Sequence, residues 1–179
     1  YNLNKKFIKQ DRPQILVTEG YFDFFRLYQH GFRYAVATLG TSLTEHHVRG
    51  LKRFAEEAVV VYDGDKAGPA ASLRGLEVFL EASMNVKLVR MPEGYDPDDF
   101  LLKFGSEAFQ KLLDGAQDFF DFKLEILLEK FNRWDSLGLM SITNDFLETL
   151  VKVKNNILLD RYLRKLGASL GVDENSLRV

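Results

Sequence analysis

Short apolar runs alternate with amphipathic stretches through the first hundred or so positions of this 179-residue chain. The runs, at 14–18, 34–38, 58–62 and 86–91, are enriched in Val, Ile, Leu and Tyr, as strands buried on both faces are. The segments between them, 23–29, 44–54 and 69–82, repeat apolar residues at helical intervals. Strands that alternate with helices predict an α/β fold with a parallel sheet of about four strands flanked by helices.

Beyond residue 100 the pattern becomes helical throughout. Helices are expected over roughly 106–114, 117–132, 139–153 and 155–170. The last two are amphipathic, which predicts a small C-terminal helical bundle. We therefore expect two domains, an α/β domain at 1–114 and a helical bundle at 115–179.

Composition narrows the possible chemistry. Hydrophobic residues make up 46% of the chain, which argues against intrinsic disorder, and the absence of cysteine excludes disulfides, thiolate zinc sites and thiol catalysis. With 24 Lys and Arg against 26 Asp and Glu, the chain lacks the basic footprint of a free-standing nucleic-acid binder. No apolar run approaches the roughly 20 residues that span a bilayer, so no membrane partner is expected. Because the chain opens with Tyr1, we expect an excised piece of a longer protein.

Acidic residues follow three of the four predicted strands. In an open parallel sheet, ligands bind beyond the carboxyl ends of the strands, so these positions are the first candidates for a site. The candidates are Glu19 and Asp23 after the first strand, Asp63 and Asp65 after the third, and Asp96 and Asp98 after the fourth.

Gathering these carboxylates requires a compensating cation. Two like charges about 4 Å apart repel by roughly 4 kcal/mol at an effective dielectric near 20. No histidine stands beside these positions, and a set of oxygen ligands favours a hard ion, Mg²⁺ or Mn²⁺, over zinc. Such an ion binds through one or two carboxylates plus substrate phosphates, which predicts phosphoryl-transfer chemistry.

Smaller residues at the same strand ends are weaker candidates for nucleotide binding. Gly20 and Gly64 lack a side chain that would keep a phosphate from the backbone, Gly40 and Thr41 follow the second strand, and Lys66 follows the third. A structural interpretation stands beside the functional one, since acids and glycines after strands also cap helices and form turns. Three acidic clusters at three strand ends of one sheet favour the metal site.

Four strings carry a resemblance to a known family. They are VTEGYFD (17–23), ATLGTSLTEHHVRGLKRF (37–54), VVYDGDKAGPAASLRGLE (60–77) and MPEGYDPDDFLLKFG (91–105). Together they resemble the Toprim region of bacterial-type DNA primases. A Glu with an Asp-x-Asp alone would match the wider Toprim superfamily of topoisomerases, nucleases and recombination mediators, whereas the second and fourth strings are closer to primases.

The resemblance implies an enzyme that copies a single-stranded DNA template into a short RNA primer from ribonucleoside triphosphates, using Mg²⁺ or Mn²⁺. It implies that Glu19, Asp63 and Asp65 are the catalytic metal ligands and that Asp23, Asp96 and Asp98 complete the acidic basin. Zinc is not expected in this fragment. The family's upstream basic segment and its zinc-binding and helicase-binding modules are absent from this sequence, so the fragment is expected to be an incomplete nucleotidyltransferase. Its implied setting is the bacterial replisome in the cytoplasm, with the replicative helicase as a partner.

Two other functions remain open for the same residues. A Toprim nuclease or topoisomerase fragment would use the carboxylates for strand cleavage. A non-catalytic Toprim module would use them to hold a structural ion while it organises partners.

Overall fold

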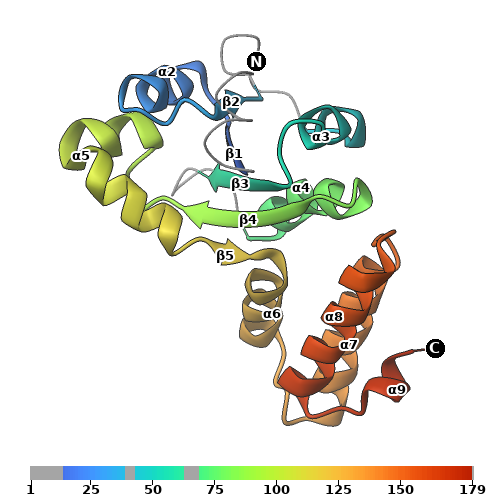
Figure 1. The fold of residues 1–179 in the computed structure, drawn as a ribbon. Helices are drawn as coiled ribbons and strands as arrows, with labels where there is room; N and C mark the ends of the chain where they lie inside the picture. Colours follow the sequence, from blue (N-terminus) through green and yellow to red (C-terminus); the bar gives the residue numbers. More distant parts are fainter. Residues whose placement is uncertain (1–13, 39–42, 63–68, 179) are drawn as a thin grey trace. The chain divides into compact units, whose positions relative to one another are not determined.

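The computed structural model describes residues 14–38, 43–62 and 69–178, except for the side chains of 69–72. The chain forms two compact units, Tyr1–Phe119 and Phe120–Val179. The first unit is an α/β sheet domain and the second is helical (Figure 1). This confirms the predicted α/β class with helices after it.

The sheet of the first unit has five strands among the described residues, in the order β2-β1-β3-β4-β5. The strands are β1 (Gln14–Thr18), β2 (Ala35–Ala37), β3 (Glu57–Tyr62), β4 (Asn85–Arg90) and β5 (Gln117–Asp118). The first four pair in parallel, as predicted, and β5 pairs antiparallel with β4. The fifth strand falls inside a segment predicted as helix, because a strand of two residues carries no periodicity that a sequence pattern can reveal.

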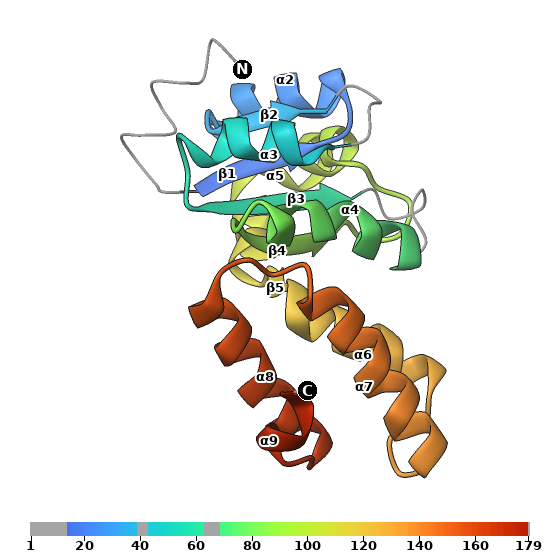
Figure 2. The same cartoon turned by 90° about the vertical axis from the view of Figure 1, so that its right-hand side faces the viewer.

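Two helices cover each face of the sheet. Helices α2 (Tyr21–Gln29) and α5 (Pro97–Asp114) lie on one face, and α3 (Glu45–Lys52) and α4 (Pro69–Glu81) lie on the other (Figures 1 and 2). Helix α5 begins at Pro97 rather than near residue 106, with Asp96 as its N-cap, and Gly105 interrupts it at φ 77°. The sequence pattern therefore predicted only the part of this helix that follows the glycine.

The strands are buried on both faces because their side chains alternate between two apolar layers. Leu16, Val59 and Val61 join one core cluster with Phe24 of α2 and Phe109 of α5. The intervening strand residues are buried as well, and they face the layer of α3 and α4. Because β1, β3 and β4 pair in parallel, their carboxyl ends lie at one edge of the sheet.

The second unit consists of α6 (Phe119–Lys130), α7 (Ser136–Leu150), α8 (Asn156–Leu170) and the short α9 (Glu174–Leu177). Its core contains the ring of Phe120, whose centroid lies 4.8 Å from that of Phe146 and 5.7 Å from that of Tyr162. Packing of these aromatic rings accounts for the amphipathic pattern seen in α7 and α8.

One charged side chain is buried inside the second unit. Lys123 of α6 is only 3% exposed, and its ammonium group lies 2.6 Å from Asp145 Oδ1 and 2.6 Å from Thr149 Oγ1, both on α7. An unpaired ammonium at this depth would be strongly destabilising, and the paired one fixes the position of α6 against α7. Nothing local in the sequence shows that Asp145 will lie beside this lysine.

The connection between α6 and α7 is tightly built. Asp135 caps α7 by accepting a 3.1 Å hydrogen bond from the backbone of Gly138. A Cβ atom added at Gly138 would lie 2.1 Å from the carbonyl oxygen of Asn132, which is far inside van der Waals contact. Gly138 is therefore required by close backbone approach rather than by its φ angle.

We predict that Gly138→Ala lowers the stability of the chain by about 1–3 kcal/mol, because the new methyl group must displace backbone atoms. Thermal unfolding followed by far-UV circular dichroism measures the effect. Gly50→Ala is the matched control: a Cβ at Gly50 meets nothing within 4 Å, and alanine favours the helix by up to about 1 kcal/mol. Equal melting temperatures for Gly138→Ala and the unmodified chain would contradict this assignment.

Candidate functional site

Glu19 lies directly after β1, at the edge of the sheet where the parallel strands end. It is half-buried, and Gly20 follows it as the N-cap of α2. Asp23 is 6% exposed, and its Oδ2 accepts a 3.1 Å hydrogen bond from the backbone N–H of Gly20. The Asp23 carboxylate thus sits at the positive end of the α2 dipole and fixes the turn that carries Glu19.

The register of β1 and β3 brings the third strand to the same place. Val17 and Val60 form the last pair of this register, and Glu19 and Tyr62 each come two residues after that pair. Asp63 is the next residue in the sequence. The predicted residues Asp63, Gly64, Asp65 and Lys66 lie outside the described residues, but the strand that leads to them ends beside Glu19.

Tyr62 is a functional candidate that the sequence pattern missed. Burial and the negative charge of Glu19 raise the pKa of Tyr62 to about 12. Its phenol oxygen reaches α4, where it lies 2.8 Å from the position that a Cβ of Gly75 would occupy. The only signal for Tyr62 in the sequence is that it ends a buried strand immediately before an acidic turn.

The predicted acids after the fourth strand have structural partners. Asp96 caps α5 by accepting a 2.8 Å hydrogen bond from the backbone N–H of Asp99. Asp98 Oδ1 lies 2.5 Å from Nε of Arg26 on α2, and both side chains are about three-quarters buried. The structural interpretation of this acidic cluster is thus correct for its local contacts, and the cluster ties α5 to α2.

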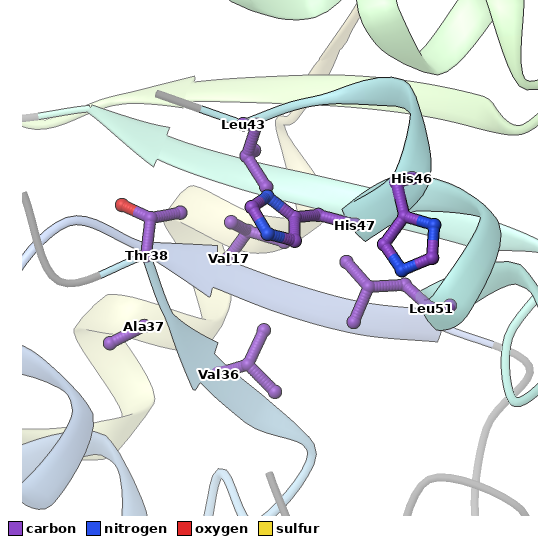
Figure 3. Close-up of a pocket in the computed structure, with 9 residues that line it drawn as sticks. Val17, Val36, Ala37, Thr38, Leu43, His46, His47 and Leu51 are labelled. Atoms are coloured by element: carbon purple, nitrogen blue, oxygen red, sulfur yellow. The ribbon is translucent and has the colours of Figure 1, made fainter. Parts of the chain in front are cut away.

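A pocket of about 320 Å³ lies where β1 and β2 end beneath α3 (Figure 3). Val17 and Thr38 line it from the sheet, and His46, His47 and Leu51 line it from α3. The backbone N–H of Thr38 donates to the carbonyl of Thr18, the residue before Glu19. Gly40 and Thr41, predicted to line a pocket here, lie outside the described residues.

The donor chemistry at the strand ends fits a hard cation. Glu19 offers carboxylate oxygens, and the residues that follow Tyr62 in the sequence add two more carboxylates. Within residues 14–38, 43–62 and 69–178, no group of three or more His, Asp or Glu is arranged to hold a metal ion. Asp63 and Asp65 lie outside the described residues.

The histidines of the described residues have other contacts. His30 Nδ1 lies 3.1 Å from Ser106 Oγ, and the ring of His47 accepts a hydrogen bond from the backbone N–H of Thr44 at the start of α3.

The helices within the described ranges are too short or too polar to cross a bilayer.

Residues 16–101 match the Toprim-like protein family. The chain is 34% identical over 177 residues to the DNA primase of Clostridium acetobutylicum, which covers 99% of this chain and 30% of that protein. It is 41% identical over 117 residues to the DNA primase of Aquifex aeolicus, covering 65% of this chain and 23% of the relative. The chain thus spans less than a third of the length of these curated relatives.

Solved structures of primases share the fold. A DNA primase domain from Pseudomonas aeruginosa superposes with a TM-score of 0.89 at 30% identity, covering 99% of this chain and 57% of that chain. The DnaG primase catalytic domain bound to single-stranded DNA superposes with a TM-score of 0.86 at 30% identity, covering 96% of this chain and 56% of that chain. These matches confirm the resemblance carried by the four sequence strings.

We predict that Arg26 and Asp98 stabilise the contact between α2 and α5 by about 1 kcal/mol, because the pair is shielded from solvent on the helix interface. A double-mutant cycle with Arg26→Gln and Asp98→Asn, read by urea unfolding, gives this coupling energy. The exposed pair Arg49 and Glu45 on α3 is the control, with an expected coupling of about 0.3–0.5 kcal/mol. Equal coupling in the two cycles would mean that the Arg26 pair adds nothing beyond an ordinary surface contact.

Proposed function

Because the chain belongs to the bacterial-type DNA primase family, as a segment of its Toprim-containing catalytic core, we propose that it carries the metal-binding part of a primer-synthesis site. The proposed reaction joins ribonucleoside triphosphates into a short RNA primer on a single-stranded DNA template. The chain is a nucleotidyltransferase segment, and the parent protein supplies the rest of the enzyme.

One observation carries this proposal: β1 and β3 pair in parallel up to Val17 and Val60, and Glu19 and Tyr62, the residue that precedes Asp63, each come two residues later. Carboxylates from two strands 44 positions apart in the sequence (63 − 19) are thereby led to one edge of the sheet. That is the edge where open α/β sheets bind their ligands.

In the proposed site, Glu19, Asp63 and Asp65 hold Mg²⁺ or Mn²⁺. The bound ion supplies Lewis-acid chemistry, which activates the primer 3′-hydroxyl and offsets the charge of the triphosphate. The carboxylates orient the reacting groups. The reaction needs no nucleophile from the protein. Asp23 holds the turn of Glu19, while Asp96 and Asp98 complete the acidic basin from α5.

Nucleotide contacts are proposed at the small and basic residues of the strand ends. Gly64 allows a phosphate to approach the backbone, and Lys66 offers a cation to the triphosphate. At Gly20 the backbone N–H is already bonded to the Asp23 carboxylate, so the missing side chain there serves that contact. Gly40 and Thr41 follow Thr38, which lines the pocket under α3. These residues contact the nucleotide beside the metal ligands in this proposal.

Template and partners belong to the same proposal. A related catalytic domain has been solved with single-stranded DNA, which supports a template of that kind here. Because the chain spans only about 30% of its curated relatives, further segments of the parent protein are proposed to supply basic template contacts and the replicative-helicase interface. The proposed location is the bacterial cytoplasm.

We predict that Glu19→Gln or Asp63→Asn in the parent protein reduces primer synthesis by roughly 100-fold or more, because a lost ligand removes several kcal/mol of transition-state stabilisation. Extension of a labelled primer on single-stranded DNA measures it, with melting temperature as the folding check. Glu148→Gln, at an exposed position of α7, is the control and keeps full activity. Normal synthesis by either site variant would remove that residue from the metal site.

The presence of the ion is tested by anomalous diffraction from a Mn²⁺-soaked crystal, with a peak expected beside Glu19.

A DNA-cleavage assay of the parent protein separates the primase proposal from a Toprim nuclease. Metal-dependent cutting without primer synthesis would overturn the proposed reaction.

A further inference from the structure

We propose that the outward side of α2, formed by Tyr21, Phe22 and Phe25, is an interface between domains of the parent protein. Its occupant is the part of the parent's catalytic core that lies outside these 179 residues. We call the three side chains the aromatic face of α2. The inference depends on the membership of the chain in the primase family and not on the metal role proposed for Glu19.

The aromatic face is open to solvent in this chain. Tyr21 is 58% exposed, Phe22 79% and Phe25 54%. The rings of Tyr21 and Phe25 stack with their centroids 6.2 Å apart. At about 100° per residue, the three positions fall on one side of the helix, so they form one continuous patch.

The opposite side of α2 already packs on the sheet. Phe24 and Leu27 are buried in the core cluster that contains Leu16 of β1 and Phe109 of α5. A rotation of α2 that buried the aromatic face would expose Phe24 and Leu27 instead. The sheet can cover only one side of the helix, so a cover for the aromatic face must come from outside this unit.

The size of the patch favours an occupant in the same polypeptide. At these exposures, three rings of roughly 200 Å² each leave on the order of 400 Å² in contact with water, which is the size of patch that often marks a function. Two such faces would bury roughly 800 Å² together. That area lies within the roughly 600–1,500 Å² typical of interfaces between domains of one chain and below the roughly 1,200–2,000 Å² of stable complexes between separate proteins.

The charges around the patch favour a protein over a nucleic acid. Sites for single strands combine stacking rings with a positively charged groove that follows the phosphates. The only cation of α2 is Arg26, and its guanidinium group is paired with Asp98. Glu19 and Asp23 place negative charge at the start of the same helix. Phosphates would be repelled here, whereas an apolar protein surface meets no such barrier.

The related solved structures contain enough additional chain to supply the cover. The primase domain from Pseudomonas aeruginosa matches 99% of this chain with only 57% of its own residues. The remainder of that domain has no counterpart in the 179 residues. Because α2 starts two residues after Glu19, a segment docked on the aromatic face would also be held beside the proposed metal site.

The first test compares hydroxyl-radical labelling, read by mass spectrometry, in the 179-residue chain and in the parent protein. Phe22 and Phe25 should be labelled severalfold more slowly in the parent, because the interface excludes water. Phe24 should be labelled slowly in both proteins, which checks that α2 is folded. Trp134, which is 82% exposed on the connection between α6 and α7, is the exposed control and should be labelled equally. Equal labelling of Phe22 in the two proteins would overturn the inference.

The second test identifies the occupant. The parent protein is prepared with p-benzoylphenylalanine in place of Phe22, irradiated, and digested for mass spectrometry. The expected cross-link joins α2 to a peptide of the same molecule that lies outside the 179 residues. A cross-link to a second copy, or to added single-stranded DNA, would overturn the inference in favour of self-association or of a template platform.

The third test disrupts the face in the parent protein. Phe22→Asp combined with Phe25→Asp should raise the labelling of Tyr21 to the level seen in the 179-residue chain, while Phe24 stays protected. Trp134→Asp replaces an equally exposed ring elsewhere and should leave Tyr21 protected. Continued protection of Tyr21 in the double variant would contradict the interface. None of these tests measures primer synthesis, so a failure of the metal site at Glu19 would leave their results intact.

Discussion

Two-sided burial of the parallel strands is the constraint on which the remaining structure depends. Ile15 and Leu16 are neighbours in β1, point to opposite faces, and are both fully buried. A slip of one residue would keep apolar side chains on both faces but would change which of them pack against each helix layer, so close packing specifies the register. The register in turn decides which residues follow the strands at this edge, and Glu19 and Tyr62 each come two residues after the pair of Val17 and Val60.

The acidic residues near the carboxyl edge of the sheet have different local roles. Asp23 and Asp96 act as helix caps, and Asp98 is neutralised by Arg26. Their charges are therefore offset by backbone N–H groups or by a guanidinium, which lessens the repulsion that six unscreened carboxylates would create. The structural and functional interpretations of such residues are compatible, because a carboxylate that holds a turn also contributes its charge to the basin beside it.

Two other side chains, Tyr62 and Lys123, also combine a place in an element with a polar group that reaches another element. Tyr62 completes a buried strand, and its hydroxyl reaches Gly75 beside the charge of Glu19. In the second unit, Lys123 completes a helix interface while its ammonium group remains paired with Asp145. For Lys123, the partner on another helix offsets the cost of burying a charge.

Local patterns in the sequence were sufficient for the four parallel strands and for helices α7 and α8, since these depend on periodicity within short windows. The acidic candidates Glu19 and Asp63 come from motif spacing and stay predictions. Tertiary structure decided the antiparallel β5, the pairing of Arg26 with Asp98 across 72 positions, and the contact of Tyr62 with Gly75. Those features arise from packing between elements far apart in the chain. A pattern of neighbouring residues does not indicate which side chain from a distant part of the chain will pack beside a given residue.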